Sequence, residues 1–416
     1  MDRMQLAIIG CGGMGGRHLY GLRALKEAES CPFDLVGACD VRQDNAAYLA
    51  ERAAEMLGQR PQVYTDMEEM AAALPDLQAV DVTTPNGTHH VVVPSAMELG
   101  WHVLCEKPVA LTLRGANVMI EAQERYGKVL SVAENFRRDP ICRLTRALLD
   151  AGAVGQPYML FWVGAQAGNG IIIVPNRHDK YSAGFVTSSG VHTTDLMQYY
   201  LGNIKEIYAR TRQWEPIRYK ATMRSVSRFY EHWYDTIPDE VQATAEDTLV
   251  SVFEFESGAM GQWTTFFAGH GEPFAHSAVY GSEGSLRLAG ARNGQPVILH
   301  RDDRGEVPEN ELLDLVPDFH LDEITARLFG ADRLTSYDGG FDMADAALIA
   351  HEYYELAECI TTGKTPEVDV YVGRKDLAAV YAAHESNLLD RAVTLQEVEA
   401  ERTAVYESDI NEHWGI

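Results

Sequence analysis

The sequence of 416 residues lacks an apolar run of the roughly 18 residues that a membrane-spanning helix needs. Its first residues also lack the basic start, long apolar stretch and small-residue cleavage site of a signal peptide. We therefore expect a cytoplasmic protein with no membrane partner. Because 46% of the residues are hydrophobic and the chain is too long for one ordinary core, we expect two packed domains.

Basic residues are scarce. Lysine and arginine together number 35 against 61 acidic residues, which gives a formal net charge of -26 at pH 7. Proteins that bind a nucleic-acid backbone need clustered lysine and arginine to displace its counterions. The composition therefore argues against a nucleic-acid partner.

Cysteines are few and scattered. None of the six forms a C-x-x-C pair, and several lie in apolar segments that are typical of buried strands. We interpret them as reduced core thiols and predict neither a disulfide framework nor a metal site. The chain also has no internal repeat.

What is present in the first 135 residues is an alternation of short apolar runs with helical segments. These runs are too uniformly apolar for one face of the strand to be exposed to solvent. They therefore predict a parallel sheet covered by helices on both sides. Ligands of such sheets lie at the carboxyl ends of the strands. The predicted strands are 5–9, 35–39, 78–82, 102–105 and 129–133, and the predicted helices that follow the second, third and fourth strands are near 44–57, 88–99 and 112–126.

The first strand ends in a glycine-rich loop, Gly10-Cys11-Gly12-Gly13-Met14-Gly15. Its first glycine permits a tight turn, the second lets backbone approach a pyrophosphate, and the third lets helix and strand pack closely. The helix that follows offers free N–H groups to phosphates. A glycine-rich turn without a ligand is the alternative, but the position between a strand and a helix favours a bound dinucleotide.

Asp40 ends the second predicted strand at about the distance expected for a residue that accepts hydrogen bonds from an adenosine ribose. Its charge would repel a 2'-phosphate, which favours NAD over NADP. Arg42 leaves NADP open, because a guanidinium at this place can pair with that phosphate. A helix N-cap is the other role open to Asp40.

Glu106-Lys107-Pro108, together with the glycine loop and Thr83-Thr84-Pro85-Asn86, resembles the Gfo/Idh/MocA family of oxidoreductases, and the resemblance covers nearly the whole chain. It implies that Lys107 lies beside the nicotinamide and the reacting carbinol. An ammonium there can donate to the substrate oxygen and stabilise a developing alkoxide. The cofactor residues it implies are Gly10, Gly12, Gly13, Met14, Gly15, Asp40, Arg42, Thr84, Pro85, Asn86, His89, Glu106, Lys107 and Asn135.

The segment 184–195 resembles the family's second motif, in which G-x-H-x-x-D opens a helix. His192 corresponds to the family's catalytic histidine, and Asp195 lies one helical turn later on the same face. Imidazole is suited to take the hydroxyl proton, and Asp195 is expected to orient the ring or to bind a sugar hydroxyl. A structural role for a helical histidine is the alternative.

Two departures from the family pattern concern the substrate. Ser188 stands four residues before the histidine, where many members carry an aspartate, so that side chain is uncharged here. Asn176-Arg177 replaces a frequent Trp-Arg pair. Arg177, His178 and Tyr181 are therefore candidate pocket residues, and an ordinary polar loop is the alternative.

Residues 136–416 are expected to form the second domain, a mostly antiparallel open sheet covered by helices. In the family such a sheet packs on a second subunit, which implies a homodimer or homotetramer. The aromatic-rich insertions 214–240 and 296–340 are candidate lids, oligomer contacts or packing segments, and helices near 342–362 and 373–390 are expected to cover the sheet. The predicted strands are near 157–166, 205–213, 246–255, 259–268, 274–280 and 284–288, after a helix near 140–151.

The resemblance implies an NAD(P)-dependent dehydrogenase that oxidises a secondary hydroxyl of a sugar, glycoside or cyclitol. Hydride would pass to the nicotinamide, His192 would act as the base, and Lys107 would steady the oxygen. An NAD-dependent glycosidase of the same fold is the alternative. A catalytically silent cofactor-binding regulator would be expected to have lost Lys107 and His192.

Overall fold

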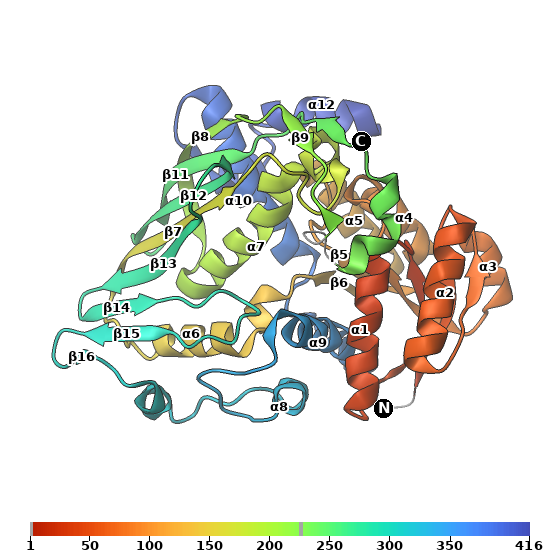
Figure 1. Cartoon of the computed structure of the whole chain (residues 1–416), viewed down its shortest axis with the longest axis horizontal. Coiled ribbons are helices and arrows are strands. Elements are labelled where there is room, and N and C mark those ends of the chain that lie inside the picture. The colour runs from red at the N-terminus through yellow and green to blue at the C-terminus, as the bar shows by residue number, and fades with distance from the viewer. Residues whose placement is uncertain (1–2, 224–227) are drawn as a thin grey trace.

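The computed structural model describes residues 3–223 and 228–416. Two sheet-based domains lie side by side, with the chain's red-to-orange first third on one side and the open sheet on the other (Figure 1). Residues 224–227, part of the expected insertion 214–240, lie outside the described residues.

The first domain is built on a six-stranded parallel sheet, as the alternating pattern predicts. Its order is β3-β2-β1-β4-β5-β6, so the direction of strand addition reverses between β1 and β4, where a crevice opens at the carboxyl ends. The strands are β1 (Met4–Ile9), β2 (Phe33–Cys39), β3 (Gln62–Tyr64), β4 (Leu77–Val82), β5 (His102–Glu106) and β6 (Leu130–Ala133). β3 was not predicted, because three residues are too few to show a pattern.

Helices cover both faces of this sheet in two separate apolar clusters. One cluster joins the sheet to α1 (Gly13–Glu27) and α2 (Gln43–Leu57). The other joins it to α3 (Met67–Ala73), α4 (His89–Glu98) and α5 (Leu113–Tyr126). Right-handed crossovers place α1 and α2 on one face of the sheet and α3, α4 and α5 on the other. On the face that carries α1, no described helix of the first domain covers β5 and β6.

That bare face is covered by α9 (Gly340–Thr362), which comes from far along the chain. Ile349 and Tyr353 of α9 are buried against Leu19 and Leu22 of α1. A side chain at Gly21 would lie 2.5 Å from Ile349, so the glycine permits the close approach. The expectation that helix 342–362 covers the second sheet is therefore wrong, because its apolar face completes the first domain.

The second domain contains a nine-stranded sheet of order β16-β15-β14-β13-β7-β12-β11-β8-β17. Every neighbouring pair is antiparallel except β7 with β12, so the sheet is mixed but mostly antiparallel, as expected. The strands are β7 (Pro157–Ala167), β8 (Ile204–Arg212), β11 (Thr248–Phe255), β12 (Met260–Gly269), β13 (Phe274–Gly281), β14 (Gly284–Arg287), β15 (Ile298–Arg301), β16 (Gly305–Glu306) and β17 (Val393–Thr394).

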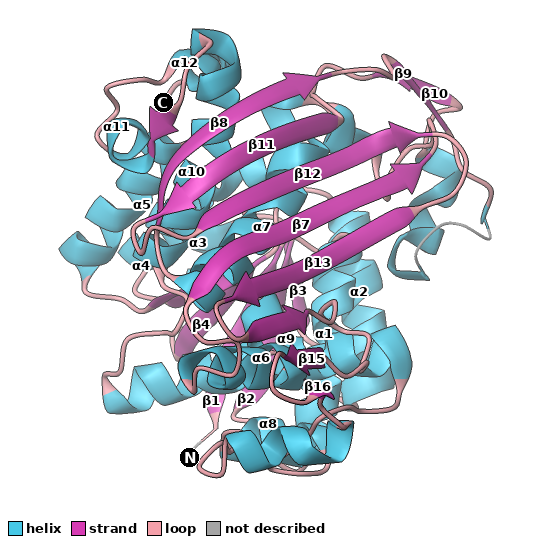
Figure 2. Cartoon of the chain, turned by 90° about the vertical axis from the view of Figure 1, so that its left-hand side faces the viewer, coloured by secondary structure: helices cyan, strands magenta, loops and turns pink. Residues whose placement is uncertain are grey.

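One face of this sheet packs on helices and the other is open in the single chain. Along β11 the side chains alternate between buried Leu249 and Phe253 and exposed Val250 and Val252. The main helices of the covered face are α7 (Gly184–Leu201) and α10 (Val370–Leu389), with α6 (Pro140–Asp150) alongside. Figure 2 looks onto the open face, where no described helix lies in front of β8, β11, β12, β7 and β13.

The remaining elements connect or border these layers. The insertion 214–240 contains a hairpin of β9 (Ile217–Tyr219) and β10 (Glu240–Gln242) and a 3₁₀ helix, η6 (Arg228–Thr236). The other short elements are the 3₁₀ helices η1 (Asn86–Thr88), η2 (Phe136–Arg138), η3 (Pro175–His178), η4 (Lys180–Ser182) and η7 (Glu309–Leu315), and the helices α8 (Glu323–Phe329), α11 (Leu395–Glu399) and α12 (Val405–Trp414).

Within the described part of the chain, no helix combines the length and apolarity that crossing a membrane requires. All six cysteines carry free thiols, and five of them are buried, as expected for core residues.

Candidate active site

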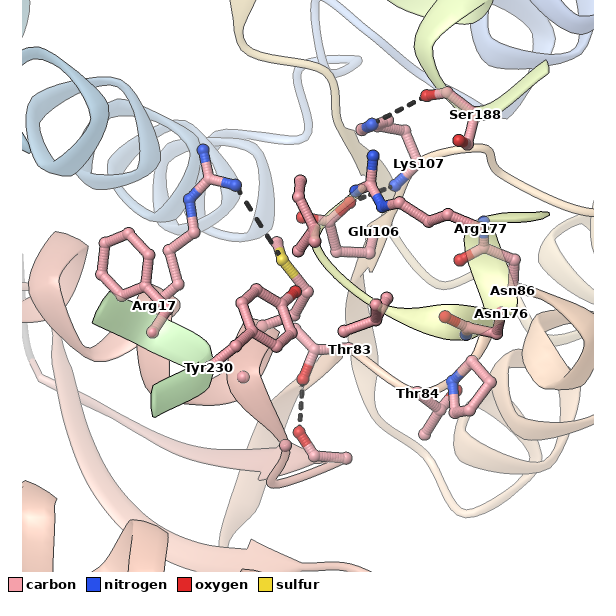
Figure 3. A pocket seen from close by; sticks show the side chains of 18 of the residues that line it. Arg17, Thr83, Thr84, Asn86, Glu106, Lys107, Asn176, Arg177, Ser188 and Tyr230 are labelled. Atoms are coloured by element: carbon pink, nitrogen blue, oxygen red, sulfur yellow. Dashed lines mark hydrogen bonds between the residues drawn. The ribbon is translucent and has the colours of Figure 1, made fainter. Parts of the chain in front are cut away.

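A cavity of about 700 Å³ lies between the two domains at the carboxyl ends of the parallel strands. It is lined by the glycine loop and Asp40 and also by Lys107, Ser188 and His192. Figure 3 shows Lys107 beside Ser188 at one end of it. A second hollow of about 540 Å³ shares Gly10 and Asp40 with the first. The two hollows adjoin at these shared residues, and we call them together the groove.

Three of the four loop glycines, Gly10, Gly12 and Gly15, have different neighbours. Gly10 has a φ of +96°, and a side chain there would lie 2.6 Å from the backbone nitrogen of Thr84. Beside Gly12 the space is open, and a side chain at Gly15 would collide with the carbonyl of Gly10. At Gly12 the loop therefore presents bare backbone just before α1, which suits a diphosphate, whereas the ring of Tyr230 covers Gly13.

Asp40 is held rigidly at the end of β2. Its Oδ2 accepts from the backbone N–H of Cys11 at 2.7 Å, and its Oδ1 accepts from that of Arg42 at 2.9 Å. The residue at the N-cap of α2 is Arg42, so Asp40 does not have the capping role. Arg42 pairs with Asp44 at 2.6 Å, and both side chains are more than half exposed.

Thr84, Pro85 and Asn86, which the resemblance predicts to be cofactor residues, line the cavity. His89 does not: it is buried behind the loop, with one ring nitrogen 3.1 Å from the carbonyl of Pro108 and the other 3.1 Å from that of Thr84. His89 therefore connects the loop after β4 to the loop after β5 and does not face the cavity.

A buried chain of polar groups lies behind the end of β5. His18 of α1 joins Asp81 at 2.9 Å to Glu106 at 3.2 Å, and Tyr353 of α9 donates to Asp81. Burial alone would raise the pKa of Glu106, but the hydrogen bond and charge of His18 lower it to about 2. Glu106 is thus held as a carboxylate beside Lys107, and no sequence motif had indicated His18 or Asp81.

Lys107 reaches across the domain boundary. Its Nζ donates to the backbone carbonyl of Ser188 on α7 at 2.9 Å, so Ser188 contributes a carbonyl to the site as well as an uncharged side chain. Burial, reinforced by the charge of Arg177, lowers the pKa of Lys107 to about 7. An ammonium with that pKa is a strong donor and gives up its proton readily.

His192 is fixed by two residues that follow β6. Its Nδ1 lies 2.7 Å from Oε1 of Glu134, and its ring stacks on Phe136 with centroids 3.9 Å apart. Burial lowers the pKa of His192 well below its usual value and raises that of Glu134 to about 7. Sequence reasoning missed Glu134, although an acidic residue directly after an apolar strand was the signal that had identified Asp40.

Asp195 is not the partner of His192. Both of its oxygens lie 3.0 Å from Nε of Arg137, its side chain is fully buried, and it does not line the cavity. The buried guanidinium of Arg137 requires a carboxylate partner, and Asp195 supplies it. The expected roles of Asp195 in orienting the ring or binding a sugar hydroxyl have no support in this geometry.

The candidate substrate residues on the segment before α7 separate into two groups. Arg177 lines the cavity. His178 is buried and accepts from the backbone N–H of Ile172 at 2.9 Å, and Tyr181 turns outward to stack on His413 at 4.5 Å. His178 and Tyr181 therefore hold the loop, and the structure does not bring them to the pocket.

The cavity also has lining residues that the sequence did not indicate. Their side chains come from α1, η2, η6, α9 and the loop between β14 and β15, so no local pattern could group them. They are Arg17, Phe136, Phe229, Tyr230, Arg292 and Phe341.

Comparison with known sequences identifies both domains. Residues 4–134 match the model described as "Oxidoreductase family, NAD-binding Rossmann fold", and residues 142–287 match that of the "GFO/IDH/MocA C-terminal domain". The chain belongs to this family. The groove at the glycine loop is accordingly the NAD site of a Gfo/Idh/MocA Rossmann domain.

The relatives of this family member include sugar and cyclitol dehydrogenases. The chain is 30% identical over 216 residues to the D-apiose dehydrogenase of Paraburkholderia graminis, covering 51% of this chain and 53% of that protein. It is 25% identical over 305 residues to the scyllo-inositol 2-dehydrogenase (NAD(+)) of Bacillus subtilis, covering 71% and 70%. The chain spans about half the length of several curated relatives, the first of these two included.

Solved structures share the fold over nearly the whole chain. The oxidoreductase domain protein of Kribbella flavida superposes with a TM-score of 0.74 at 22% identity, over 95% of this chain and all of that one. At this level of identity the match concerns the fold alone.

The residues around the groove fit NAD. The bare backbone at Gly12 faces open space, Asp40 offers a fixed ribose acceptor, and apolar side chains such as Val92 and Leu99 line the second hollow. At the other end, Oδ1 of Asn135 is buried without a hydrogen-bond partner in the described part of the chain. An amide donor such as that of a nicotinamide would satisfy it.

Proposed function

We propose that the protein oxidises a secondary hydroxyl of a sugar, glycoside or cyclitol with NAD as the oxidant. The observation that carries this proposal is that Lys107 and His192, from different domains, line one cavity at the end of the NAD groove. The sugar and inositol dehydrogenases among its relatives support the same substrate class.

His192 is the proposed base. When Glu134 is ionised, its carboxylate accepts from Nδ1–H, so Nε2 keeps the lone pair that can take a hydroxyl proton. The low pKa of His192 keeps its imidazole neutral and able to accept a proton. The carboxylate of Glu134 then stabilises the imidazolium that forms.

Lys107 is the proposed electrophile. Its ammonium, held by the carbonyl of Ser188, is suited to donate to the substrate oxygen and stabilise the developing alkoxide. NAD supplies the acceptor for the hydride that leaves the same carbon. Phe136 and Phe185 help to exclude water from this end of the cavity.

The test is a screen of sugars, glycosides and inositols with NAD and with NADP, read by the absorbance of the reduced cofactor. On any substrate found, His192→Ala should lower turnover by about two orders of magnitude or more and leave NAD binding intact. Unchanged turnover would remove His192 from the mechanism. Release of an aglycone without accumulation of NADH would instead indicate the glycosidase reaction.

We further propose that the functional unit is a homo-oligomer formed through the open sheet. Exposed Tyr208, Val252, Met260, Phe274 and Tyr280 lie on the strands of that sheet. Exposed apolar side chains gathered on one sheet face are typical of a protein–protein contact surface.

A further inference from the structure

The catalytic end of the cavity carries more cationic than acidic groups in a protein whose net charge is -26. Arg17, Lys107, Arg177 and Arg292 line that end with Glu106, and Glu134 lies behind His192. Glu106 is already engaged by His18 and by the backbone of Lys107. The local charge thus opposes the charge of the whole molecule.

Arg17 and Arg292 share a single carboxylate. Nε of Arg17 donates to Oδ2 of Asp345 at 2.7 Å, and Nη1 of Arg292 donates to Oδ1 of the same residue at 2.8 Å. Asp345 therefore neutralises one of these two charges. Nε of Arg292 is buried and has no hydrogen-bond partner among residues 3–223 and 228–416.

Arg292 belongs to the wall beside the proposed base. Its guanidinium lies over the ring of Phe136 at 4.5 Å, and the other neighbour of that ring is His192, stacked on it at 3.9 Å. The positive charge of Arg292 also lowers the pKa of His192, after the larger effect of burial.

Arg177 has no carboxylate partner within the described part of the chain. Its guanidinium lies over the ring of Phe185 at 5.5 Å and otherwise faces the cavity. Figure 3 shows it beside Glu106 and Lys107, at the Ser188 side of the pocket. Burial lowers the pKa of Arg177, so its charge is held in this pocket at a cost that an anionic ligand would offset.

The NAD diphosphate does not account for these two arginines. Its donors are the free N–H groups at the start of α1, beside Gly12 and Gly13. Arg177 and Arg292 instead adjoin Lys107 and His192, where the reacting carbon must lie. The uncharged side chain of Ser188 adds no negative charge to this wall.

We propose that the substrate is a sugar acid whose carboxylate is bound by Arg177 and Arg292 while Lys107 and His192 act on a neighbouring hydroxyl. Guanidinium groups bind carboxylates through paired, charge-assisted hydrogen bonds, which suits both arginines. The inference rests on the proposed dehydrogenase function and narrows its substrate to the anionic members of the class.

The experiment compares matched neutral and acidic substrates: D-glucose with D-glucuronate and D-galactose with D-galacturonate, all at saturating NAD. We expect kcat/KM to be at least 10-fold higher for an acid than for its neutral partner. Arg177→Gln should lower kcat/KM on the acid by at least 10-fold and leave the Kd for NADH within two-fold. Arg177→Lys keeps the charge but not the planar guanidinium. Its kcat/KM on the acid should lie between that of the parent protein and that of Arg177→Gln.

Binding is measured separately from turnover, by titrating each hexuronate into the NADH complex of the parent protein, Arg177→Gln and the matched control Arg212→Gln. Arg212 is an arginine of β8 outside the cavity, so its replacement should change nothing. Thermal unfolding of each variant shows whether it is folded. Arg292→Gln gives a second, independent variant.

The outcomes separate the two proposals. Equal use of neutral and acidic sugars, unaffected by Arg177→Gln, overturns the inference and leaves the dehydrogenase function standing. Weaker NADH binding by Arg177→Gln assigns the arginine to the cofactor and also overturns it. Hexuronate binding that depends on Arg177 without any oxidation supports the anionic site and contradicts the proposed function. If neither oxidation nor Arg177-dependent binding is observed, both proposals are contradicted.

Discussion

At the level of single residues, the partner of His192 determines which ring nitrogen can accept a proton. Glu134 lies 58 positions away in sequence, yet its Oε1 is 2.7 Å from Nδ1. Its backbone neighbour Phe136 donates its N–H to the same oxygen at 3.1 Å and stacks on the histidine ring. A substitution at Glu134 can therefore remove the negative charge beside His192 while keeping an acceptor that orients the histidine ring.

We predict that Glu134→Gln lowers kcat by about 10- to 100-fold, because the hydrogen bond to His192 loses the charge of its acceptor. The amide oxygen can still accept from Nδ1–H, so KM and NADH binding should stay within two-fold. Because burial raises the pKa of Glu134 to about 7, its ionised form becomes populated as pH rises through that value. The parent's kcat should rise as pH approaches that value and fall above it, because the pKa of Lys107 is also about 7 and its ammonium is then lost. The variant should lack the rise and keep the fall.

The matched control for Glu134 is Glu407→Gln. Glu407 is also buried, with its pKa raised by burial to about 8, and it accepts from the backbone N–H of Leu113 away from the cavity. The pH profile of kcat should survive that change. A profile for Glu134→Gln that matches the parent's would contradict the positioning role.

At the level of elements, η6 joins the second domain to the cofactor domain. Its Trp233 donates from Nε1 to Oδ1 of Asn45 at 3.1 Å, and Asn45 lies 3.5 Å from Asp40. Tyr230 occupies the space where a side chain on Gly13 would lie, so η6 covers the glycine loop. This part of the insertion 214–240 packs on the cofactor domain of its own chain.

We predict that Trp233→Phe weakens NADH binding by about 3- to 10-fold, the range of a neutral hydrogen bond, because Asn45 and Asp40 lose their support from η6. The Kd is measured by the fluorescence of NADH. Trp214→Phe is the control, because Trp214 is exposed and does not line the cavity. If the two variants bind NADH equally well, η6 does not stabilise the ribose site.

At the level of the whole molecule, the open sheet face and the acidic charge act in opposite directions. Apolar side chains on strands β8, β11, β12 and β13 favour association, whereas a charge of -26 favours separation of copies at low salt. Val252 lies near the middle of the face, paired with Tyr208 on one side and Gln262 on the other.

We predict that Val252→Lys shifts the protein toward a monomer, measured by sedimentation or light scattering. A lysine in a buried interface must be desolvated without a partner, which opposes association. Val405→Lys is the matched control, because Val405 on α12 is 56% exposed, as is Val252. A parent protein that is monomeric at micromolar concentration would contradict the oligomer proposal.

The sequence by itself determined the features that depend on contiguous residues. The glycine loop, Asp40 and Lys107 each follow an apolar strand directly, so the strand's end places them at the crevice of a parallel sheet. Short apolar runs in the sequence likewise indicated five of the six parallel strands and the main strands of the second sheet.

Only the tertiary structure decided which distant groups meet. It paired His192 with Glu134 and Asp195 with Arg137, placed α9 on the first domain, and brought Arg177 and Arg292 to one pocket. Periodicity tells which face of an element is apolar, but not which partner that face will find. Buried charges then select their partners by distance and desolvation in the folded chain, which no local spacing expresses.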